Sequence, residues 1–336
     1  MTTLAPGPLE MFCDRFGVSS PFNTERIRAG RNSEVLLLRN RQGRWILKHY
    51  YQHVSDRRDR LGTEFGFLAF LQDSGVCRVP RPLGADRDLG YGLYSFLSGT
   101  RPDAVASAHI SQAAAFVREI NWHRRSAGAR RLPKAADACV SWRDHLNLTE
   151  SRLNQLLAMT PTVPVDFEAH SFVRDQLIEY WAKLKSRILR EVDVGELADP
   201  LQPEDQMISP SDFGFHNTLE NEGHLSFVDF EYAGWDDPAK LICDFICQPE
   251  LPVSASQGLQ FLEELLLDLP GSDDVGRRVK HLLPVHRVKW CCILMNEFKF
   301  EDRKRRSHAG VEPDGLLARQ LGKAKQYFDT HLASTH

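Results

Sequence analysis

The sequence lacks the features that would place it among membrane or nucleic-acid-binding proteins. No apolar run approaches the roughly 20 residues that a membrane-spanning helix requires. An excess of one charge is also missing, because 42 Lys and Arg residues stand against 45 Asp and Glu residues and leave a net charge of −3. A near-neutral chain has no electrostatic reason to bind nucleic acid or an anionic membrane. We therefore expect neither as a partner.

Targeting and metal-binding patterns are equally scarce. The first residues, Met1-Thr-Thr-Leu-Ala-Pro6, lack the basic start and apolar stretch of a secretory signal. The seven cysteines form no CxxC pair. Two close pairs occur, Cys243/Cys247 and Cys291/Cys292, but no second pair of ligands follows either. Reduced, buried thiols in a cytoplasmic protein are therefore expected, rather than a zinc site.

The length and composition allow more than one hydrophobic core. The chain has 336 residues, of which 42% are apolar and 26% charged, a balance typical of ordinary globular proteins. Such a length corresponds to two compact units or to one large two-lobed domain.

The first hundred residues are rich in β-type patterns with one helix. The strands expected are 34–39, 44–50 and 91–97, and turn residues at 40–43 make the first two a hairpin. A helix is expected through Leu71, with Ser55 and Asp56 as candidate N-caps.

From about residue 104 the pattern becomes helical and amphipathic. Residues 207–229 return briefly to strand–loop–strand, and the chain after Pro238 is helical nearly to its end. This order predicts a bilobal α+β fold. A small N-terminal antiparallel β lobe with one helix, residues 1–97, precedes a larger, mostly helical C-terminal lobe, residues 98–336.

The most informative stretch contains two carboxylates and an amide. Four residues separate Asp212 from Asn217 in a loop, and Asp229 follows the next apolar strand. Folding this stretch as a hairpin brings the three side chains to one edge. Phosphoryl transfer needs such a set: one carboxylate orients a hydroxyl and accepts its proton, while an amide oxygen and a second carboxylate hold Mg²⁺ against the phosphates.

This stretch resembles the aminoglycoside phosphotransferase and choline kinase superfamily, which has a protein-kinase-like fold. The family's catalytic loop reads His-Gly/Asn-Asp-x-x-x-x-Asn. Its metal segment, Ile-Asp-Phe/Trp-Glu-x-Ala-Gly-x-x-Asp-Pro, is nearly complete at residues 228–238. The resemblance makes Asp212 the catalytic carboxylate and makes Asn217 and Asp229 the metal ligands. The sequence departs from the family at Pro210, which replaces a supporting His.

The resemblance also implies an ATP site in the N-terminal lobe. Gly30 and Ser33 are similar to the family's phosphate-covering turn. Lys48 lies between apolar residues on a strand, where burial without a counter-charge would be costly, and Glu64 in the next helix can supply that charge. The remaining residues implied for the nucleotide are Val35 and Ile46, facing the adenine, and Ser95, Phe96 and Leu97, whose backbone would read its edge.

Two residues near the motifs have roles that the sequence leaves open. His216 occupies a variable slot of the catalytic loop, and packing or surface exposure is favoured over a role as a base. Glu231 could support the loop or touch a substrate.

The function implied by the resemblance is an ATP- and Mg²⁺-dependent kinase that moves the γ-phosphoryl group to a hydroxyl of a small molecule. A catalytically silent nucleotide-binding protein that kept the kinase fold is one alternative. A protein Ser/Thr kinase ranks third, because the short segment between Asp229 and Asp237 leaves little room for a peptide-binding platform.

The acceptor expected from the charge pattern is neutral or weakly charged, and sugar-like. A polycation such as an aminoglycoside would need converging carboxylates, but basic residues lie among the acidic ones in the C-terminal helices. The acidic residues are Glu297, Glu301 and Asp302, and the basic ones are Lys299 and residues 303–306. A choline-like cation is the alternative acceptor. It needs an aromatic cage, which Trp235, Trp290 and Phe298 could build, although a core role explains them adequately.

Overall fold

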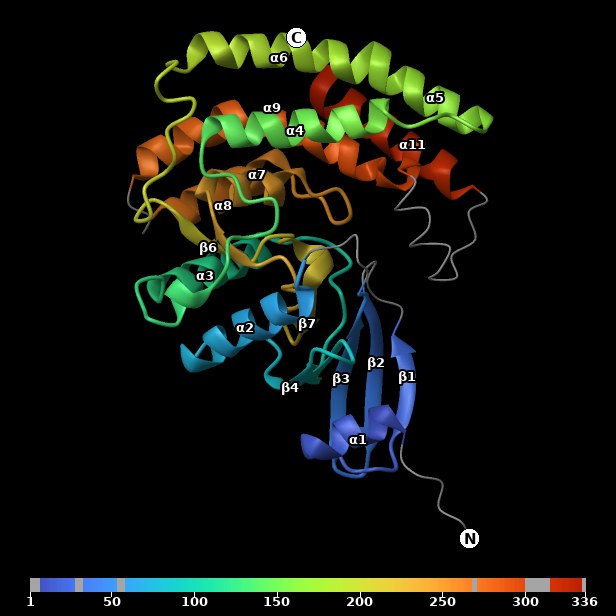
Figure 1. Cartoon of the computed structure of the whole chain (residues 1–336). Helices are drawn as coiled ribbons and strands as arrows, with labels where there is room; N and C mark the ends of the chain where they lie inside the picture. The colour runs from blue at the N-terminus through green and yellow to red at the C-terminus, as the bar shows by residue number, and fades with distance from the viewer. Residues whose placement is uncertain (1–6, 28–32, 53–57, 268–270, 300–314, 334–336) are drawn as a thin grey trace. The chain divides into compact units, whose positions relative to one another are not determined.

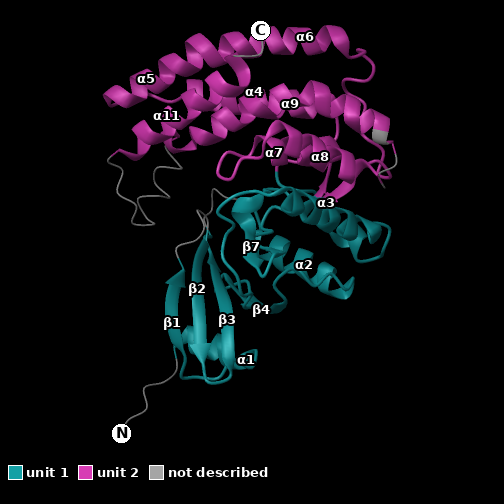
Figure 2. Cartoon of the chain, turned by 180° about the vertical axis from the view of Figure 1, so that it is seen from behind, with its two compact units in different colours: residues 1–136, 210–234 teal, residues 137–209, 235–336 magenta. Residues whose placement is uncertain are grey.

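The computed structural model describes residues 7–27, 33–52, 58–267, 271–299 and 315–333 (Figure 1). The chain forms two compact units (Figure 2). Unit 1 comprises residues 1–136 and 210–234, and unit 2 comprises residues 137–209 and 235–336. The functional boundary predicted after residue 97 lies inside unit 1 and stays a prediction. No helix in the described ranges is long and apolar enough to cross a membrane.

Unit 1 contains a five-stranded antiparallel sheet with the order β1-β2-β3-β5-β4. Its strands are β1 (Asn23–Ile27), β2 (Ser33–Asn40), β3 (Gly43–Tyr50), β4 (Pro82–Asp86) and β5 (Tyr91–Ser95). The hairpin of β2 and β3 and the presence of β5 confirm the predicted strands. Sequence analysis did not predict the two edge strands. Four of the five residues of β1 are exposed, so it has no alternating pattern, and β4 contains Pro82 and Gly84.

The two faces of this sheet have different roles. One face packs against α1 (Pro8–Arg15), which sequence analysis also did not predict (Figure 1). Their shared core consists of Phe12, Cys13, Val18, Leu38, Leu47 and Leu93. Because side chains alternate along a strand, Lys48 lies on the opposite face, with Val35 directly across from it on β2.

The helix α2 (Arg60–Asp73) follows the hairpin and runs two residues beyond the predicted end at Leu71. Its N-cap is Asp59, whose carboxylate accepts a hydrogen bond from the Gly62 N–H at 2.8 Å. The predicted caps Ser55 and Asp56 lie outside the described residues.

An aromatic cluster holds the rest of unit 1 together. The elements of this part of unit 1 are α3 (Ser107–Trp122), the short 3₁₀ turns η1 (Ala129–Arg131) and η3 (Phe215–Asn217), and the hairpin β7 (Thr218–Asn221) and β8 (His224–Phe227). The rings of Phe116 on α3 and Phe227 on β8 stack at 4.1 Å, and Phe67 on α2 lies 5.0 Å from Phe230. These contacts fix the hairpin between the two helices.

Unit 2 is helical, as predicted. Its longer helices are α4 (Trp142–Leu157), α5 (Pro164–Phe172), α6 (Ile178–Glu191), α7 (Pro238–Cys247), α8 (Ala255–Leu266), α9 (Ser272–Leu294) and α11 (Leu316–Phe328). Shorter elements are the π-helical turns η2 (Val173–Leu177) and η5 (Asp329–Ala333), the 3₁₀ turn η4 (Asn296–Phe298), and the paired strands β6 (Met207–Ser209) and β9 (Gly234–Asp236). The central helix α9 packs against α4, α7 and α11 (Figure 1).

Three carboxylates in the interior of unit 2 pair with cationic side chains of the same unit; Asp236 and Asp237 are fully buried, and Asp244 is partly buried. The pairs are Asp236 with Lys240 at 2.7 Å, Asp237 with Arg278, and Asp244 with Lys289. Burial would raise the pKa of Asp237, but hydrogen bonding from His145 and the charge of Arg278 hold it below its ordinary value. Asp237 is therefore held in its charged form, whereas burial raises the pKa of Asp236 above its ordinary value.

Two buried histidines connect two of these carboxylates. His145 Nε2 lies 2.9 Å from Asp237, His286 Nδ1 lies 3.1 Å from Asp244, and the two rings meet through His145 Nδ1 and His286 Nε2 at 2.9 Å. Which ring nitrogen donates at each contact depends on the tautomers of the two rings. Burial, with Lys289 nearby, lowers the pKa of His286 to about 3 and disfavours its charged form.

Gly234 offers a test of the packing in unit 1, where it lies against residues 133–135. An added Cβ would lie 2.3 Å from the Pro133 carbonyl oxygen and 2.6 Å from the Ala135 nitrogen, both backbone atoms. Gly234→Ala should therefore lower the free energy of unfolding by about 2 kcal/mol or more in urea titrations. Gly66→Ala is the matched control. This site in α2 is open, so alanine should add about 0.5–1 kcal/mol. Wild-type stability of Gly234→Ala would contradict the packing.

Candidate active site

A buried lysine bound by two carboxylates is the centre of the candidate site. Lys48 Nζ lies 2.8 and 2.9 Å from the two carboxylate oxygens of Glu64 and 2.8 Å from Asp229 Oδ1. Lys48 is 9% exposed and Glu64 only 2%. Burial alone would lower the pKa of Lys48, but the charges of Asp229 and Glu64 outweigh it and raise the pKa above its ordinary value. Lys48 is therefore a permanent cation in a fixed position.

Two tyrosines support Glu64 from the other side. Tyr50 Oη lies 2.5 Å from Glu64 Oε2, and Tyr94 Oη lies 2.8 Å from Tyr50 Oη. Because Tyr50 donates its proton to the carboxylate, Tyr94 must donate to Tyr50. Burial and the neighbouring Glu64 raise the pKa of Tyr50 well above its usual value. Sequence analysis missed both as site residues, although Tyr50 lies two residues after Lys48 and so shares its strand face.

Helix α2 holds the segment after Asp229 at two points. The Phe230 N–H donates to Glu64 Oε1 at 3.3 Å, and Arg60, one turn earlier, lies 3.7 Å from Glu231. Glu231 is buried, and its pairing with Arg60 is consistent with support of the loop. Asp229 itself has a φ of +71°, a left-handed conformation that is rare outside glycine. Such strain is typical of functional sites.

The hairpin brings the loop of Asp212 and Asn217 beside this segment. Thr218 pairs with Phe227, and the Val228 N–H donates to the Asn217 carbonyl at 3.0 Å. The Asn217 side-chain amide donates to the Asp212 carbonyl at 3.0 Å, which closes the loop on itself.

Two buried phenylalanines anchor this loop, which has Pro210 where the similar family has His. Phe213 and Phe215 are buried on either side of Gly214, and the Phe213 ring stacks with Phe116 at 6.0 Å. Ser211, just before Asp212, has a φ of +56°. The loop backbone is therefore fixed by aromatic packing without a histidine at position 210.

The structure describes most of the other residues that were predicted to contact a nucleotide. Val35 and Ile46 lie on the same sheet face as Lys48, because cross-strand partners share a face. Ser33 begins β2, whereas Gly30 lies outside the described residues.

The strand predicted over 91–97 ends at Ser95, so Phe96 and Leu97 lie beyond the sheet ladder. Their backbone N–H and C=O groups are not part of the β5 pairing. The Arg44 guanidinium covers the Phe96 ring at 4.1 Å.

The donor set fits Mg²⁺ shared with a ligand rather than a closed metal cage. Within the described ranges, no three His, Cys, Asp or Glu side chains form a metal-binding cluster. Mg²⁺ in phosphoryl-transfer sites is usually held by one or two carboxylates together with substrate phosphates. The Asn217 side-chain nitrogen is committed to Asp212, which leaves its Oδ1 as the acceptor beside the Asp229 segment.

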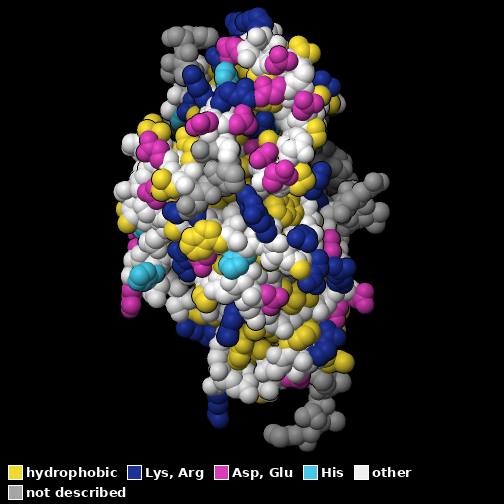
Figure 3. Space-filling view, turned by 90° about the vertical axis from the view of Figure 1, so that its left-hand side faces the viewer, with side chains coloured by type: hydrophobic (Ala, Val, Ile, Leu, Met, Phe, Trp, Pro, Cys, Tyr) yellow, Lys and Arg dark blue, Asp and Glu magenta, His cyan; other side chains and the backbone are white. Residues whose placement is uncertain are grey.

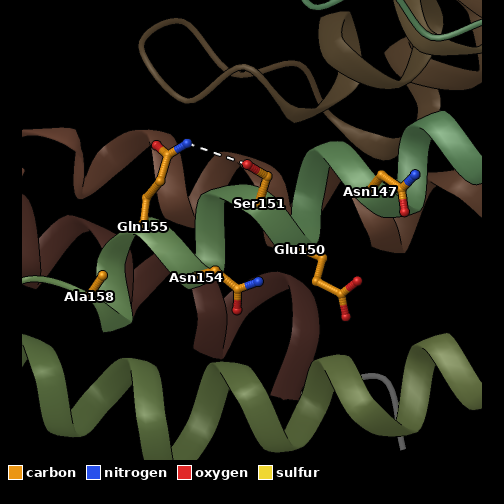
Figure 4. A pocket seen from close by; sticks show the side chains of 6 residues that line it. All are labelled: Asn147, Glu150, Ser151, Asn154, Gln155 and Ala158. Carbon is orange, nitrogen blue, oxygen red and sulfur yellow. Dashed lines mark hydrogen bonds between the residues drawn. The ribbon is translucent and has the colours of Figure 1, made fainter.

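A separate hollow of about 450 Å³ lies along α4 in unit 2 (Figure 4). It is lined by Asn147, Glu150, Ser151, Asn154, Gln155 and Ala158. Ser151 and Gln155 lean to one side of the helix, and Glu150 and Asn154 lean to the other, so their polar groups do not converge. Glu150 is already bound by Lys185 at 2.7 Å. This hollow holds none of the predicted site residues.

Similarity to known proteins is found at the level of the family and at the level of the fold. Residues 23–247 match the phosphotransferase enzyme family. None of the curated proteins matches the chain. Several solved structures do.

A choline kinase from Streptococcus pneumoniae has a TM-score of 0.60 at 12% identity, over 96% of this chain and 99% of its own. A macrolide 2'-phosphotransferase from Brachybacterium faecium has a TM-score of 0.59 at 15% identity, over 91% and 98%. An amicoumacin kinase in complex with AMP-PNP, Ca²⁺ and amicoumacin has a TM-score of 0.56 at 13% identity, over 92% and 88%.

At these identities the solved structures establish the fold, which is protein-kinase-like, as predicted. The family match is independent of them and covers about two thirds of the chain, including Lys48, Glu64, Asp212, Asn217 and Asp229. The chain belongs to the phosphotransferase enzyme family.

Proposed function

We propose that this chain transfers the γ-phosphoryl group of ATP to a hydroxyl group of a small molecule and uses Mg²⁺. The observation that carries the proposal is the fixed position of Lys48 between Glu64 and Asp229. The amicoumacin kinase, which shares the fold, holds AMP-PNP and Ca²⁺ and supports a nucleotide and a divalent cation here as well.

The nucleotide would bind on the sheet face that carries Lys48. Lys48 Nζ would donate to the α- and β-phosphates, while Glu64, held by Tyr50, keeps the ammonium group in place. Val35 and Ile46 would contact the adenine, and the backbone of residues 95–97 would read its edge. Gly30 and Ser33 would belong to the turn that covers the phosphates.

The metal site would consist of Asn217 Oδ1 and the Asp229 carboxylate. Asp229 is 30% exposed at its side chain, so it can reach a ligand while still contacting Lys48. When bound, Mg²⁺ neutralises charge on the β- and γ-phosphates.

Asp212 would act on the acceptor. Its carboxylate, 40% exposed, orients the hydroxyl and accepts its proton as the oxygen bonds to the γ-phosphorus. The bond from the γ-phosphorus to the bridging oxygen breaks at the same time. The products are ADP and the phosphorylated acceptor, and Asp212 later returns its proton to water.

We further propose a neutral, sugar-like acceptor and a cytoplasmic location. In unit 2, Asp236, Asp237 and Asp244 are paired with Lys240, Arg278 and Lys289, so these three carboxylates offer little attraction to a polycation. The candidate aromatic cage is weakened by burial, since Trp290 and Phe298 are 9% and 3% exposed. The Trp290 indole N–H is also bound to Asp244 at 2.9 Å. All seven cysteines are described and are free thiols, which suits a reducing compartment.

Several of the charged residues from which the acceptor was predicted lie outside the described residues: Glu301, Asp302 and residues 303–306. On the face drawn in Figure 3, Lys and Arg side chains are interspersed with Asp and Glu side chains. Such a mixed face supports a small molecule rather than nucleic acid as the partner.

Asp212→Asn tests the role in the transfer step. We expect kcat for ADP release to fall by about 100-fold or more, because the amide cannot accept the hydroxyl proton, while calorimetric MgATP affinity changes little. Near-wild-type turnover of this variant would refute the assignment. A wild-type chain that binds MgATP but releases no ADP with any acceptor would be a silent kinase-fold protein.

Lys48 and Glu64 should act as one unit. We expect Lys48→Met, Glu64→Gln and the double variant to lose similar fractions of kcat/KM for ATP, because either partner alone positions the phosphates poorly. The half-exposed pair Lys185 and Glu150 in unit 2 is the control, and its variants should change kcat/KM little. Losses that multiply in the Lys48/Glu64 double variant would show that the two are not partners.

The acceptor proposal is tested by ADP release across a panel of sugars, amino alcohols and aminoglycosides. We expect turnover with a neutral polyol, because Asp236, Asp237 and Asp244 in unit 2 are already paired with cationic side chains. Rapid turnover with kanamycin-like or choline-like compounds, and none with any sugar, would overturn it.

A further inference from the structure

We propose that His216 is a positioning residue that fixes the Asp212 carboxylate for the acceptor hydroxyl. The inference rests on the proposed function, in which Asp212 receives that hydroxyl. The sequence favoured packing or surface exposure for His216 over a role as a base, and the structure packs its ring beside the Asp212 carboxylate. His216 Nε2 lies 3.4 Å from Asp212 Oδ1 across one turn of the loop.

The His216 ring is largely shielded from solvent. The side chain is 10% exposed although it lies in a loop, and its Nδ1 is buried without a hydrogen-bond partner in the part of the chain that the structure describes. A bare Nε2 would direct its lone pair at the Asp212 carboxylate, whereas an Nε2–H can donate to it. The proton therefore belongs on Nε2, which is the atom that faces Asp212.

The other anchors of the loop act on its backbone. Phe213 and Phe215 are buried, and the Asn217 side-chain amide donates to the Asp212 backbone carbonyl. Among the described residues, His216 is the one side chain that pairs with this carboxylate. The contact with His216 therefore restrains rotation about the Asp212 Cα–Cβ bond.

This arrangement divides the two oxygens of Asp212 between two tasks. Oδ1 takes the Nε2–H of His216, and Oδ2 remains for the acceptor hydroxyl. A separation of 3.4 Å is longer than a strong hydrogen bond, and catalytic contacts of this kind commonly shorten when the substrate binds. Pro210 cannot donate a side-chain hydrogen bond, so within the loop this support comes from His216.

Two substitutions separate positioning from packing. The amide nitrogen of His216→Gln reaches about as far as Nε2, whereas that of His216→Asn reaches only as far as Nδ1. Both would be assayed by ADP release with MgATP and the best acceptor of the panel, beside Asp212→Asn. We expect His216→Asn to lower kcat about 10- to 100-fold with an unchanged KM for ATP, and His216→Gln to restore turnover to within about threefold of wild type.

Three outcomes would overturn the proposal, and each would exclude a different part of it. Wild-type kcat in His216→Asn would exclude a positioning role. Equal losses in both variants, accompanied by equal drops in melting temperature, would show that the ring only fills space. If Asp212→Asn keeps wild-type turnover, the proposed function fails and the role of His216 in catalysis fails with it.

A second measurement tests the contact without turnover. Nitrogen-15 NMR of histidine-labelled protein at pH 8.5, with the His216 signal assigned by its loss in His216→Gln, reports which ring nitrogen carries the proton. We expect the Nε2–H form, and a change in its shift in Asp212→Asn. An Nδ1–H form, or a signal that does not respond to Asp212→Asn, would overturn the proposal even if no acceptor is found.

Discussion

The ion network of Lys48, Glu64 and Asp229 constrains everything else in unit 1. Its three members come from a strand, a helix and the end of a hairpin, so these elements must meet at one point for any of the charges to be paired. Removing one partner of a buried pair typically costs about 3–5 kcal/mol, because the remaining charge stays buried and uncompensated. The network therefore fixes the geometry of the fold as well as the chemistry of the site.

The surroundings of this network restrict motion at each group. Tyr50 and Tyr94 hold Glu64, and the same carboxylate accepts the Phe230 N–H, so one side chain connects the sheet, α2 and the segment of Asp229. The positive φ of Asp229 is a strained conformation that these contacts maintain. Rigid placement of charge before the reactants arrive is a major source of catalytic rate, since no reorganisation is then needed in the transition state.

The sequence predicted the parts of the molecule whose patterns are local. Alternating residues marked β2 and β3, and the resemblance marked Lys48, Glu64, Asp212, Asn217 and Asp229. The edge strand β1 is exposed and has no pattern to detect, and the support given by Tyr94 depends on pairing between distant strands. His216 was set aside for the same reason: spacing along a loop does not show that a ring turns back four residues onto a carboxylate.

The central claim is that Asp229 and Asn217 form a metal site beside the phosphate-binding Lys48. Calorimetric titration of ATP into the wild-type chain, with Mg²⁺ and with EDTA, tests this most directly. Without a cation between them, the Asp229 carboxylate and the phosphates repel each other, so we expect Mg²⁺ to tighten Kd at least about tenfold, or about 1.4 kcal/mol. Equal affinity in the two solutions, or no binding in either, would contradict the claim.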